Sequence, residues 1–179
     1  SFSVNNVALV NGRPRTLNLK QLIKYFVRHR HEVVLRRTRF DLEKAQKRAH
    51  ILEGLLKALD VIDQIINIIR SSKSVDEAKS ELIAAFGFSE AQATAIVEMR
   101  LRQLTGLERE KLQNEYDELM KFIHYCEDVL ANESMQMQII KDETAEMKEK
   151  YGDARRTEIA LSAEEFNPED FYADEDVVI

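Results

Sequence analysis

The feature that most constrains this chain is a long hydrophobic repeat that contains no proline and a single glycine, Gly54. Apolar or small residues recur at alternating steps of three and four, which is the heptad spacing of a coiled-coil helix. The repeat comprises Leu35, Thr38, Leu42, Ala45, Ala49, Leu52, Leu56 and Leu59. An earlier set has a shifted phase, so we expect a local stutter near Val34. That earlier set comprises Leu19, Leu22, Phe26 and Val33.

A glycine inside a helix costs about 1 kcal/mol relative to alanine, which is too little to end a helix with this pattern. We therefore predict one long helix over residues 18–72, opened by Asn18 and Gln21 in the arrangement of a capping box. Such a helix would be about 80 Å long, whereas a compact globule of this chain length is about 40 Å across. The molecule is therefore expected to be elongated.

A second helical seam runs through residues 107–152 and ends at Gly152. Its first part comprises Leu112, Tyr116, Leu119, Ile123, Cys126 and Leu130. After a polar interruption at residues 132–134, the seam resumes with Met137, Ile140, Thr144, Met147 and Tyr151. Two seams of this kind, separated by a short segment, predict an antiparallel coiled-coil hairpin.

The segment between the seams, residues 73–106, contains two sets of helix start and stop signals. Ser74 with Glu77 and then Ser89 with Gln92 have the spacing of capping boxes. Gly87 and Gly106 stand where helices commonly end, and Thr105 with Glu108 opens the returning helix. We expect a small helical tip at the end of the coiled coil.

The two ends of the chain differ from the rest. Residues 1–17 predict a β-hairpin, because β-prone runs flank Asn11-Gly12, the strongest short turn signal, and Pro14 confines the second strand to a sheet edge. Residues 153–179 read as an acidic linker that leads into a further strand. We expect both ends to continue into a larger protein, and the fold class to be mainly α.

Composition excludes several classes of protein. The chain has 179 residues and a net charge of −6, with 44% hydrophobic and 32% charged residues, which is too apolar for disorder and too charged for a membrane protein. No apolar run approaches the roughly 20 residues of a membrane span, and no secretion signal is recognisable. One cysteine, Cys126, rules out an internal disulfide and fits a reducing compartment, so we expect a cytoplasmic location.

No set of residues suggests catalysis or metal binding. His29 and His31 are two positions apart and point about 200° away from each other on a helix, so they cannot share a metal. Cys126 is expected to be a buried apolar residue of the seam, with His124 on another face. Packing is expected to explain Tyr116 and Tyr151. We therefore assign no catalytic residue, no metal ligand and no cofactor to this chain.

The charge of the chain is unevenly distributed. Residues 13–50 carry twelve Lys and Arg against three acids, whereas residues 157–179 carry eight acids and no Lys or Arg. Two interpretations of the basic segment remain open: a solvated helix that forms ion pairs with its partner helix, or a surface near nucleic acid. The candidate residues are Arg28, Arg30, Arg36, Arg37 and Arg39.

Four strings of the chain resemble the A subunit of DNA gyrase, a type IIA topoisomerase, in the order in which that family has them. The string NGRPRTLNLKQLIKYFVRHRHEVVLRRTRFDLEKAQKRAHILEGL (11–55) resembles the end of the tower and the descending helix. The string SEAQATAIVEMRLRQLTGLEREKL (89–112) is similar to the globule and the start of the ascending helix. YGDARRTEI (151–159) and DEDVVI (174–179) resemble the exit from the coiled coil and the lead-in to the DNA-wrapping domain.

The resemblance implies the coiled coil and exit gate of an enzyme that uses ATP to introduce negative supercoils by cutting, passing and resealing duplex DNA. It implies a homodimer through the tip, a partner in the gyrase B subunit, which holds ATP and Mg, and double-stranded DNA facing the basic residues. The family's attacking tyrosine follows an arginine, and no such pair occurs in this chain. We expect the chain alone to be inactive. The chain departs from some family members in one respect: they carry a long insertion between the positions of Arg70 and Phe88, where this chain has a short link. The resemblance therefore does not identify the partner surfaces at the tip.

The tip segment carries more apolar residues than two short helices can bury against each other. We expect Ile62, Ile65, Ile66 and Ile69 to cover some of them. The apolar residues of the tip that these isoleucines do not cover predict a two-fold interface between two copies, with polar groups at its rim. The alternative is that all of these residues lie in one monomeric core. The candidate interface residues are Phe86, Phe88, Met99, Arg100, Leu101 and Arg102.

Two other identities remain open. The same region of the topoisomerase IV A subunit shares much of this pattern, although residues 103–108 (QLTGLE) look more like gyrase. The other alternative is a coiled-coil interaction module with no enzymatic parent. Such a module would not be expected to begin with half a sheet and stop inside a strand.

Overall fold

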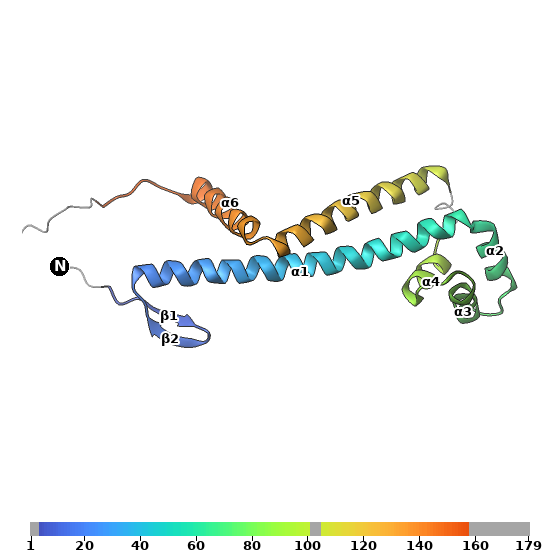
Figure 1. Ribbon diagram of the computed structural model, residues 1–179, viewed down its shortest axis with the longest axis horizontal. Coiled ribbons are helices and arrows are strands. Elements are labelled where there is room, and N and C mark those ends of the chain that lie inside the picture. The colour runs from blue at the N-terminus through green and yellow to red at the C-terminus, as the bar shows by residue number, and fades with distance from the viewer. Residues whose placement is uncertain (1–3, 101–104, 158–179) are drawn as a thin grey trace, which may run out of the picture.

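The computed structural model describes residues 4–100 and 105–157 and shows an elongated, mainly helical molecule, as the heptad repeat predicts (Figure 1). A small hairpin lies beside one end of a long helix, a cluster of short helices forms a tip at the other end, and two further helices return along the long one. The elements are β1 Val7–Val10, β2 Arg13–Thr16, α1 Leu19–Asp60, α2 Ile62–Ser71, α3 Val75–Phe86, α4 Glu90–Val97, α5 Gly106–Ala131 and α6 Glu133–Tyr151.

The hairpin forms where the turn signal predicts it. Strands β1 and β2 pair antiparallel, with Val10 opposite Arg13 and Leu9 opposite Pro14. Asn11 and Gly12 both adopt positive φ, 51° and 75°, as a two-residue type I′ turn requires. The pair of strands is the whole sheet within the described residues.

Helix α1 begins as predicted. The Asn18 side chain accepts a hydrogen bond from the Gln21 backbone N–H, and the Gln21 side chain accepts one from the Asn18 N–H, which completes the capping box. All eight residues of the predicted heptad repeat are buried or half-buried. Gly54 lies inside the helix without ending it, so that prediction is confirmed.

The prediction of one continuous helix to residue 72 is wrong. Helix α1 has 42 residues, about 63 Å, and breaks at Val61, whose φ of −120° and ψ of 29° are not helical. Continuing the heptad repeat past Leu59 would place Asp63 and Arg70 on the seam. Breaking at Val61 lets α2 turn and bury Ile65 in the core of the tip instead.

The tip consists of α2, α3 and α4, and most of its capping signals act as predicted. The Ser74 hydroxyl accepts from Glu77 N–H, Gly87 takes the left-handed conformation with φ 70°, and Ser89 with Gln92 forms a full capping box. Gly106 does not close α4, because α4 ends at Val97. It is instead the first residue of α5.

The returning helices α5 and α6 meet at Asn132, within the predicted polar interruption, and α6 turns away from the line of α5 (Figure 1). The seam of α5 is buried or half-buried along α1, as predicted. The seam of α6 is only partly buried: Ile140 is covered, but Met147 is 48% and Tyr151 71% exposed. Packing therefore does not explain Tyr151.

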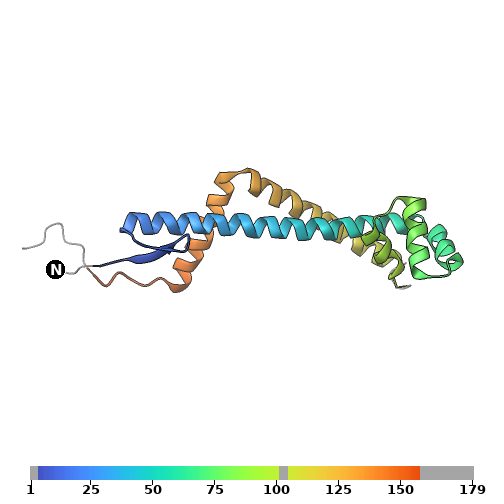
Figure 2. The same ribbon diagram turned by 90° about the horizontal axis from the view of Figure 1, so that it is seen from below.

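The N-terminal part of α1 also differs from its predicted pattern. The earlier apolar set is largely uncovered, with Leu19 69% and Phe26 52% exposed. Both α5 and the tip lie toward the other end of α1, so of the described elements only the hairpin and α6 lie near these residues (Figures 1 and 2). The apolar pattern is present here, but the described chain does not bury it.

Candidate interaction surfaces at the tip and along the long helix

The core of the tip joins α1 to the short helices. Its fully buried members come from α1, α2, α3 and α4, together with Phe88 from the loop before α4. They are Leu52, Leu55, Ala58, Ile65, Leu82, Phe88, Ala93 and Ile96. Lys57 of α1 donates to the Phe86 carbonyl at 2.7 Å and lies 5.1 Å from the centre of the Phe88 ring. The tip is therefore anchored on the last turns of α1.

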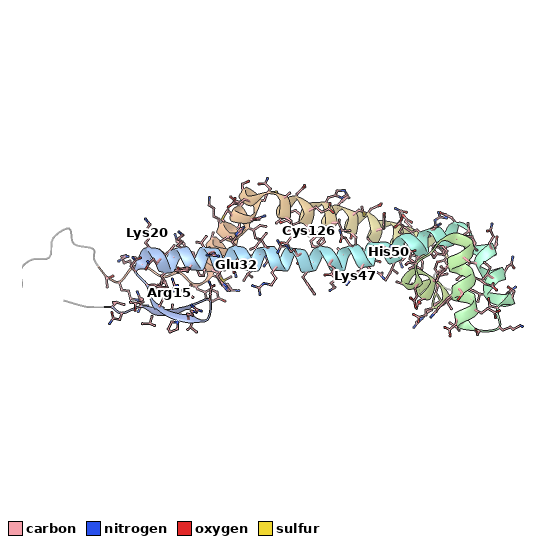
Figure 3. The ribbon with its side chains drawn as sticks, turned by 60° about the horizontal axis from the view of Figure 1, so that its bottom comes forward. Arg15, Lys20, Glu32, Lys47, His50 and Cys126 are labelled. Atoms are coloured by element: carbon pink, nitrogen blue, oxygen red, sulfur yellow. The ribbon has the colours of Figure 1, made fainter. Side chains whose placement is uncertain are left out.

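A polar cluster around Gln92 fixes α4 against α1. The Gln92 side chain is 7% exposed, and its amide donates to the His50 carbonyl at 2.8 Å. The His50 ring in turn lies 2.7 Å from the Ser89 hydroxyl (Nε2 to Oγ), and Figure 3 shows His50 beside the tip. We call these three residues, with Gly54, the tip latch.

Gly54 explains why α4 can approach α1 so closely. A Cβ atom built at Gly54 would lie 2.6 Å from Cγ of Gln92, which is closer than such atoms approach. Sequence reasoning assigned no functional role to Gly54, His50 or Gln92. The glycine itself could have indicated this close contact, because glycine destabilises the interior of a helix and is usually found there only where another segment packs closely.

The predicted interface residues do not share one environment. Phe88 is 3% exposed in the tip core, so its side chain faces its own chain and not a partner. Phe86 and Met99 are half-buried and Arg100 is exposed. Leu101 and Arg102 lie outside the described residues.

An apolar groove opens on the side of the tip between α2 and the end of α4. Its volume is about 290 Å³. Its lining residues are Ile62, Ile65, Ile66, Ile69, Arg70, Ile96, Val97 and Met99. Of the isoleucines expected to cover the tip, only Ile65 is fully buried, and Ile69 is 37% exposed. The groove is therefore an apolar surface that the described residues of the tip leave open.

The predicted basic residues on α1 fall into two groups. Arg30 and Arg37 both pair with Glu143 of α6, with an Arg37–Glu143 distance of 2.7 Å, and Arg28 pairs with Glu32 one turn further along α1. The hydrogen bond from Arg37 is the largest cause that lowers the pKa of Glu143; burial opposes it, and the charge of Arg37 and the contact with Arg30 lower the pKa further. This group fits the ion-pair interpretation.

The second group comprises Arg36 and Arg39. Both are exposed, and the salt bridges found in the described part of the chain involve neither. Beside them, Phe40 is 65% exposed. Two cations beside an exposed aromatic ring fit the alternative interpretation, a surface near an anionic partner.

The joint between α5 and α6 is polar. The side-chain amide of Gln136, which is 5% exposed, donates to the Val129 carbonyl at 2.7 Å and to the Leu130 carbonyl at 3.3 Å. These hydrogen bonds provide donors for two backbone carbonyls in the last turn of α5. The Gln136 carbonyl oxygen lies 2.5 Å from Nε2 of His31 on α1. Neither Gln136 nor Glu143 was predicted as a site residue, because their roles depend on which turn of α1 faces α6.

The described residues hold no group of three or more His, Cys, Asp or Glu that could bind a metal ion. Cys126 is buried beside α1 (Figure 3), and burial raises the pKa of its thiol, with the nearby charges of Asp41 and Glu127 adding to the effect. A thiol with a raised pKa is a poor nucleophile. None of the helices described here is long and apolar enough to cross a membrane.

Comparison with known proteins identifies the family. Residues 1–145 match the family model of the DNA gyrase/topoisomerase IV A subunit. The DNA gyrase A subunit of Clostridium acetobutylicum is 50% identical over 179 residues, which are all of this chain and 22% of the relative. Its counterpart is 51% identical over 183 residues in Streptococcus pneumoniae serotype 4 and 49% identical over 180 in Staphylococcus aureus, again with the whole chain covered and 22% and 20% of the relatives.

The chain spans about a fifth of the length of the curated relatives that it matches. The family model nevertheless covers well over half of the chain, and the identity extends over all of it. The chain belongs to the family of DNA gyrase and topoisomerase IV A subunits.

Proposed function

We propose that this chain is the coiled-coil arm and exit gate of the DNA gyrase A subunit. In that role it belongs to a topoisomerase that uses ATP to introduce negative supercoils by cutting, passing and resealing duplex DNA. The observation that carries the proposal is the arrangement of the molecule: a long two-helix arm ends in a small tip whose apolar groove is open. Family membership supports the same assignment.

A gate needs an interface that forms and reopens. The open groove offers apolar area from Ile66, Ile69, Val97 and Met99, and Arg70 lines it as a polar group. A second copy related by a two-fold axis would present the same groove, so the apolar residues of the two copies would face each other. We propose that two tips dimerise through this groove and that their separation releases the transported duplex.

The proposal extends to the partners of the whole enzyme. The gyrase B subunit would supply ATP and Mg, double-stranded DNA would pass between the arms, and the location would be the bacterial cytoplasm. We expect this chain alone to show no cleavage, ATPase or supercoiling activity, because its sequence lacks the Arg-Tyr pair of the family's attacking tyrosine. The relatives near 50% identity carry the gyrase name, which favours gyrase over topoisomerase IV.

Sedimentation velocity across a concentration series tests the gate. The 179-residue chain should sediment as a dimer at tens of micromolar, and Met99→Glu should shift it toward monomer because a carboxylate would enter the apolar groove. Met147→Glu is the matched control, since Met147 is an exposed methionine on α6 and should leave the dimer unchanged. A wild-type chain that remains monomeric, or equal effects of the two variants, would contradict the gate.

The basic segment has its own test. The exposed cations Arg36 and Arg39 should contribute weak, sequence-independent binding of duplex DNA that falls with salt, because phosphate contacts release counterions. The double variant Arg36→Glu and Arg39→Glu should reduce that binding and flatten its salt dependence. Lys121→Glu together with Lys141→Glu provides a control of equal charge on the returning helices. Unchanged binding in the α1 variant would leave only the ion-pair interpretation.

A further inference from the structure

One face of α1 carries an apolar stripe that the described chain leaves largely uncovered. Its members are spaced seven residues apart, so that they lie nearly above one another on the helix. They are Leu19, Phe26, Val33 and Phe40. Leu19, Phe26 and Phe40 are 69%, 52% and 65% exposed. This spacing is regular enough to receive a second segment of chain along the helix, and we call it the exposed stripe.

The end of the exposed stripe at Val33 and Phe40 lies among positive charges. Val33 and Phe40 line a shallow hollow of about 400 Å³ together with Arg36 and Arg37. Phe26 lines a second hollow of about 470 Å³ with Arg30 and Arg37, whose charges are balanced there by Glu143 and Glu146 of α6, so the unbalanced positive charge lies beside Phe40. Arg36 and Arg39 remain without an ion pair in the described part of the chain. The surface therefore fits a segment that carries both apolar rings and carboxylates.

The same chain contains a segment of that chemistry. Residues 158–179 include eight acids, no Lys or Arg, and three aromatic residues, Phe166, Phe171 and Tyr172. Acids lie within two positions of each aromatic residue, for example Glu165 before Phe166 and Asp170 before Phe171. The net charges of the two surfaces are opposite, so their association is favoured at low salt.

The path of the chain makes the contact possible. Helix α6 returns along α1, and the described residues after it lead toward the end of the molecule where α1 begins (Figures 1 and 2). The nine residues from Thr157 to Phe166 can span at most about 30 Å. The stripe from Leu19 to Phe40 extends over about 32 Å. The fourteen steps from Thr157 to Phe171 can span at most about 46 Å, so the segment is longer than the stripe.

We propose that residues 164–176 dock on the exposed stripe of α1, with Phe166 or Phe171 beside Val33 and Phe40 and the neighbouring acids paired with Arg36 and Arg39. This contact occupies the cations proposed above to face DNA, so the acidic segment and duplex DNA exclude each other there. The docking is tested without DNA, and its failure would leave the proposed gate untouched.

Site-directed photocross-linking of the 179-residue chain tests the docking. When p-benzoyl-phenylalanine replaces Phe40, irradiation should give intramolecular cross-links that peptide mass spectrometry locates within residues 158–179. The matched control places the same group at Phe122, an exposed phenylalanine of α5, where few such cross-links are expected. Cross-links from position 40 to another segment, to a second copy, or no excess over position 122 would overturn the proposal.

Charge variants sharpen the test. Replacing Glu164, Glu165, Glu169 and Asp170 by their amides should lower the cross-link yield about threefold to tenfold, as the loss of two or more exposed ion pairs predicts. Arg36→Glu with Arg39→Glu should have a similar effect, and about 0.5 M salt should reproduce it by screening. A cross-link yield that none of these changes alters would overturn the proposed ion pairing. Circular dichroism verifies that each variant retains its helices.

Discussion

The arm contains two kinds of helix contact, and they differ in chemistry although one heptad pattern predicts both. Between α1 and α5 the contact has a close apolar seam, because Ala45 and Ala49 are small and Ile123 fills the space beside them. Two exposed ion pairs, Arg48–Glu115 and Arg109–Asp60, lie outside this seam. Between α1 and α6 the contact relies on polar groups: Gln136 with His31, and Glu143 with two arginines. A dry contact of packed side chains is little affected by salt, whereas exposed ion pairs are screened. We call the contact of α1 with α5 the lower arm and the contact of α1 with α6 the upper joint. The lower arm is therefore expected to be stiff, and the upper joint is expected to be flexible.

The largest expected effect comes from the apolar contact. Ile123 is 6% exposed, so Ile123→Ala should lower the free energy of unfolding by about 2–4 kcal/mol through lost burial and a residual cavity. Urea denaturation followed by circular dichroism measures it. The adjacent Phe122 is 42% exposed, and Phe122→Ala should change the unfolding free energy by less than about 0.5 kcal/mol. Equal effects of the two variants would remove the distinction between the seam and the outer face.

The tip latch extends the close packing of α1 to α4. Replacing a helix glycine by alanine normally stabilises by about 1 kcal/mol, but Gly54→Ala would place its Cβ against Gln92 and should destabilise by about 1–3 kcal/mol. Thermal denaturation measures the change. Gly106→Ala is the matched control, because no atom of another described segment lies within 4 Å of its added Cβ.

A double mutant identifies the cause of that effect. Adding Gln92→Ala to Gly54→Ala removes the side chain that the new methyl group meets, so the two changes together should destabilise less than the sum of the two alone. If the two changes in unfolding free energy simply add, the destabilisation by Gly54→Ala does not come from contact with the Gln92 side chain.

The polar joint should respond locally. Gln136→Ala leaves the Val129 carbonyl without its side-chain donor and removes the partner of His31, a loss of about 1–2 kcal/mol. Hydrogen exchange should show faster exchange in α6 and little change in α5. Gln138→Ala is the control, because the Gln138 side chain bonds to the exposed Asp142 on its own helix. Faster exchange along the whole of α5 would contradict an independent joint.

The smallest effect belongs to the ion pairs of Glu143. Its side chain is 29% and that of Arg37 49% exposed, so Glu143→Gln should change stability by about 0.5 kcal/mol or less. Because the pKa of Glu143 is lowered in the fold, its contribution is complete above the ordinary glutamate pKa and disappears as the pH falls through the lowered value. The difference in unfolding free energy between wild type and variant should therefore vanish in acid. A difference that grows in acid would reverse this assignment.

Local signals in the sequence predict much of the fold. The Asn11-Gly12 turn, the Asn18 cap and the left-handed Gly87 all depend on a few neighbouring residues, so the sequence is sufficient to place them. The heptad seam likewise predicts which face of α1 meets α5. These features needed no knowledge of how distant elements pack.

The remaining features depend on contacts between distant segments. The break at Val61 has no glycine or proline to mark it, because burial of Ile65 against the tip decides it. The burial of Phe88 and the pairing of Glu143 with Arg30 and Arg37 depend on where α4 and α6 lie along α1. Composition alone could show a basic segment, but not which of its cations are already paired.

Pulsed dipolar spin-label spectroscopy tests the contrast between the two contacts most directly. A label at Lys44 on α1, combined with one at Glu110 on α5 or at Lys148 on α6, reports the lower arm and the upper joint from one reference point, and all three sites are exposed. We expect a narrow Lys44–Glu110 distance distribution that about 1 M salt leaves unchanged, because the apolar seam holds α5 on α1, and a Lys44–Lys148 distribution that salt broadens. Two distributions that respond equally to salt, or a broad one in the lower arm, would contradict a stiff apolar arm joined to a yielding polar joint.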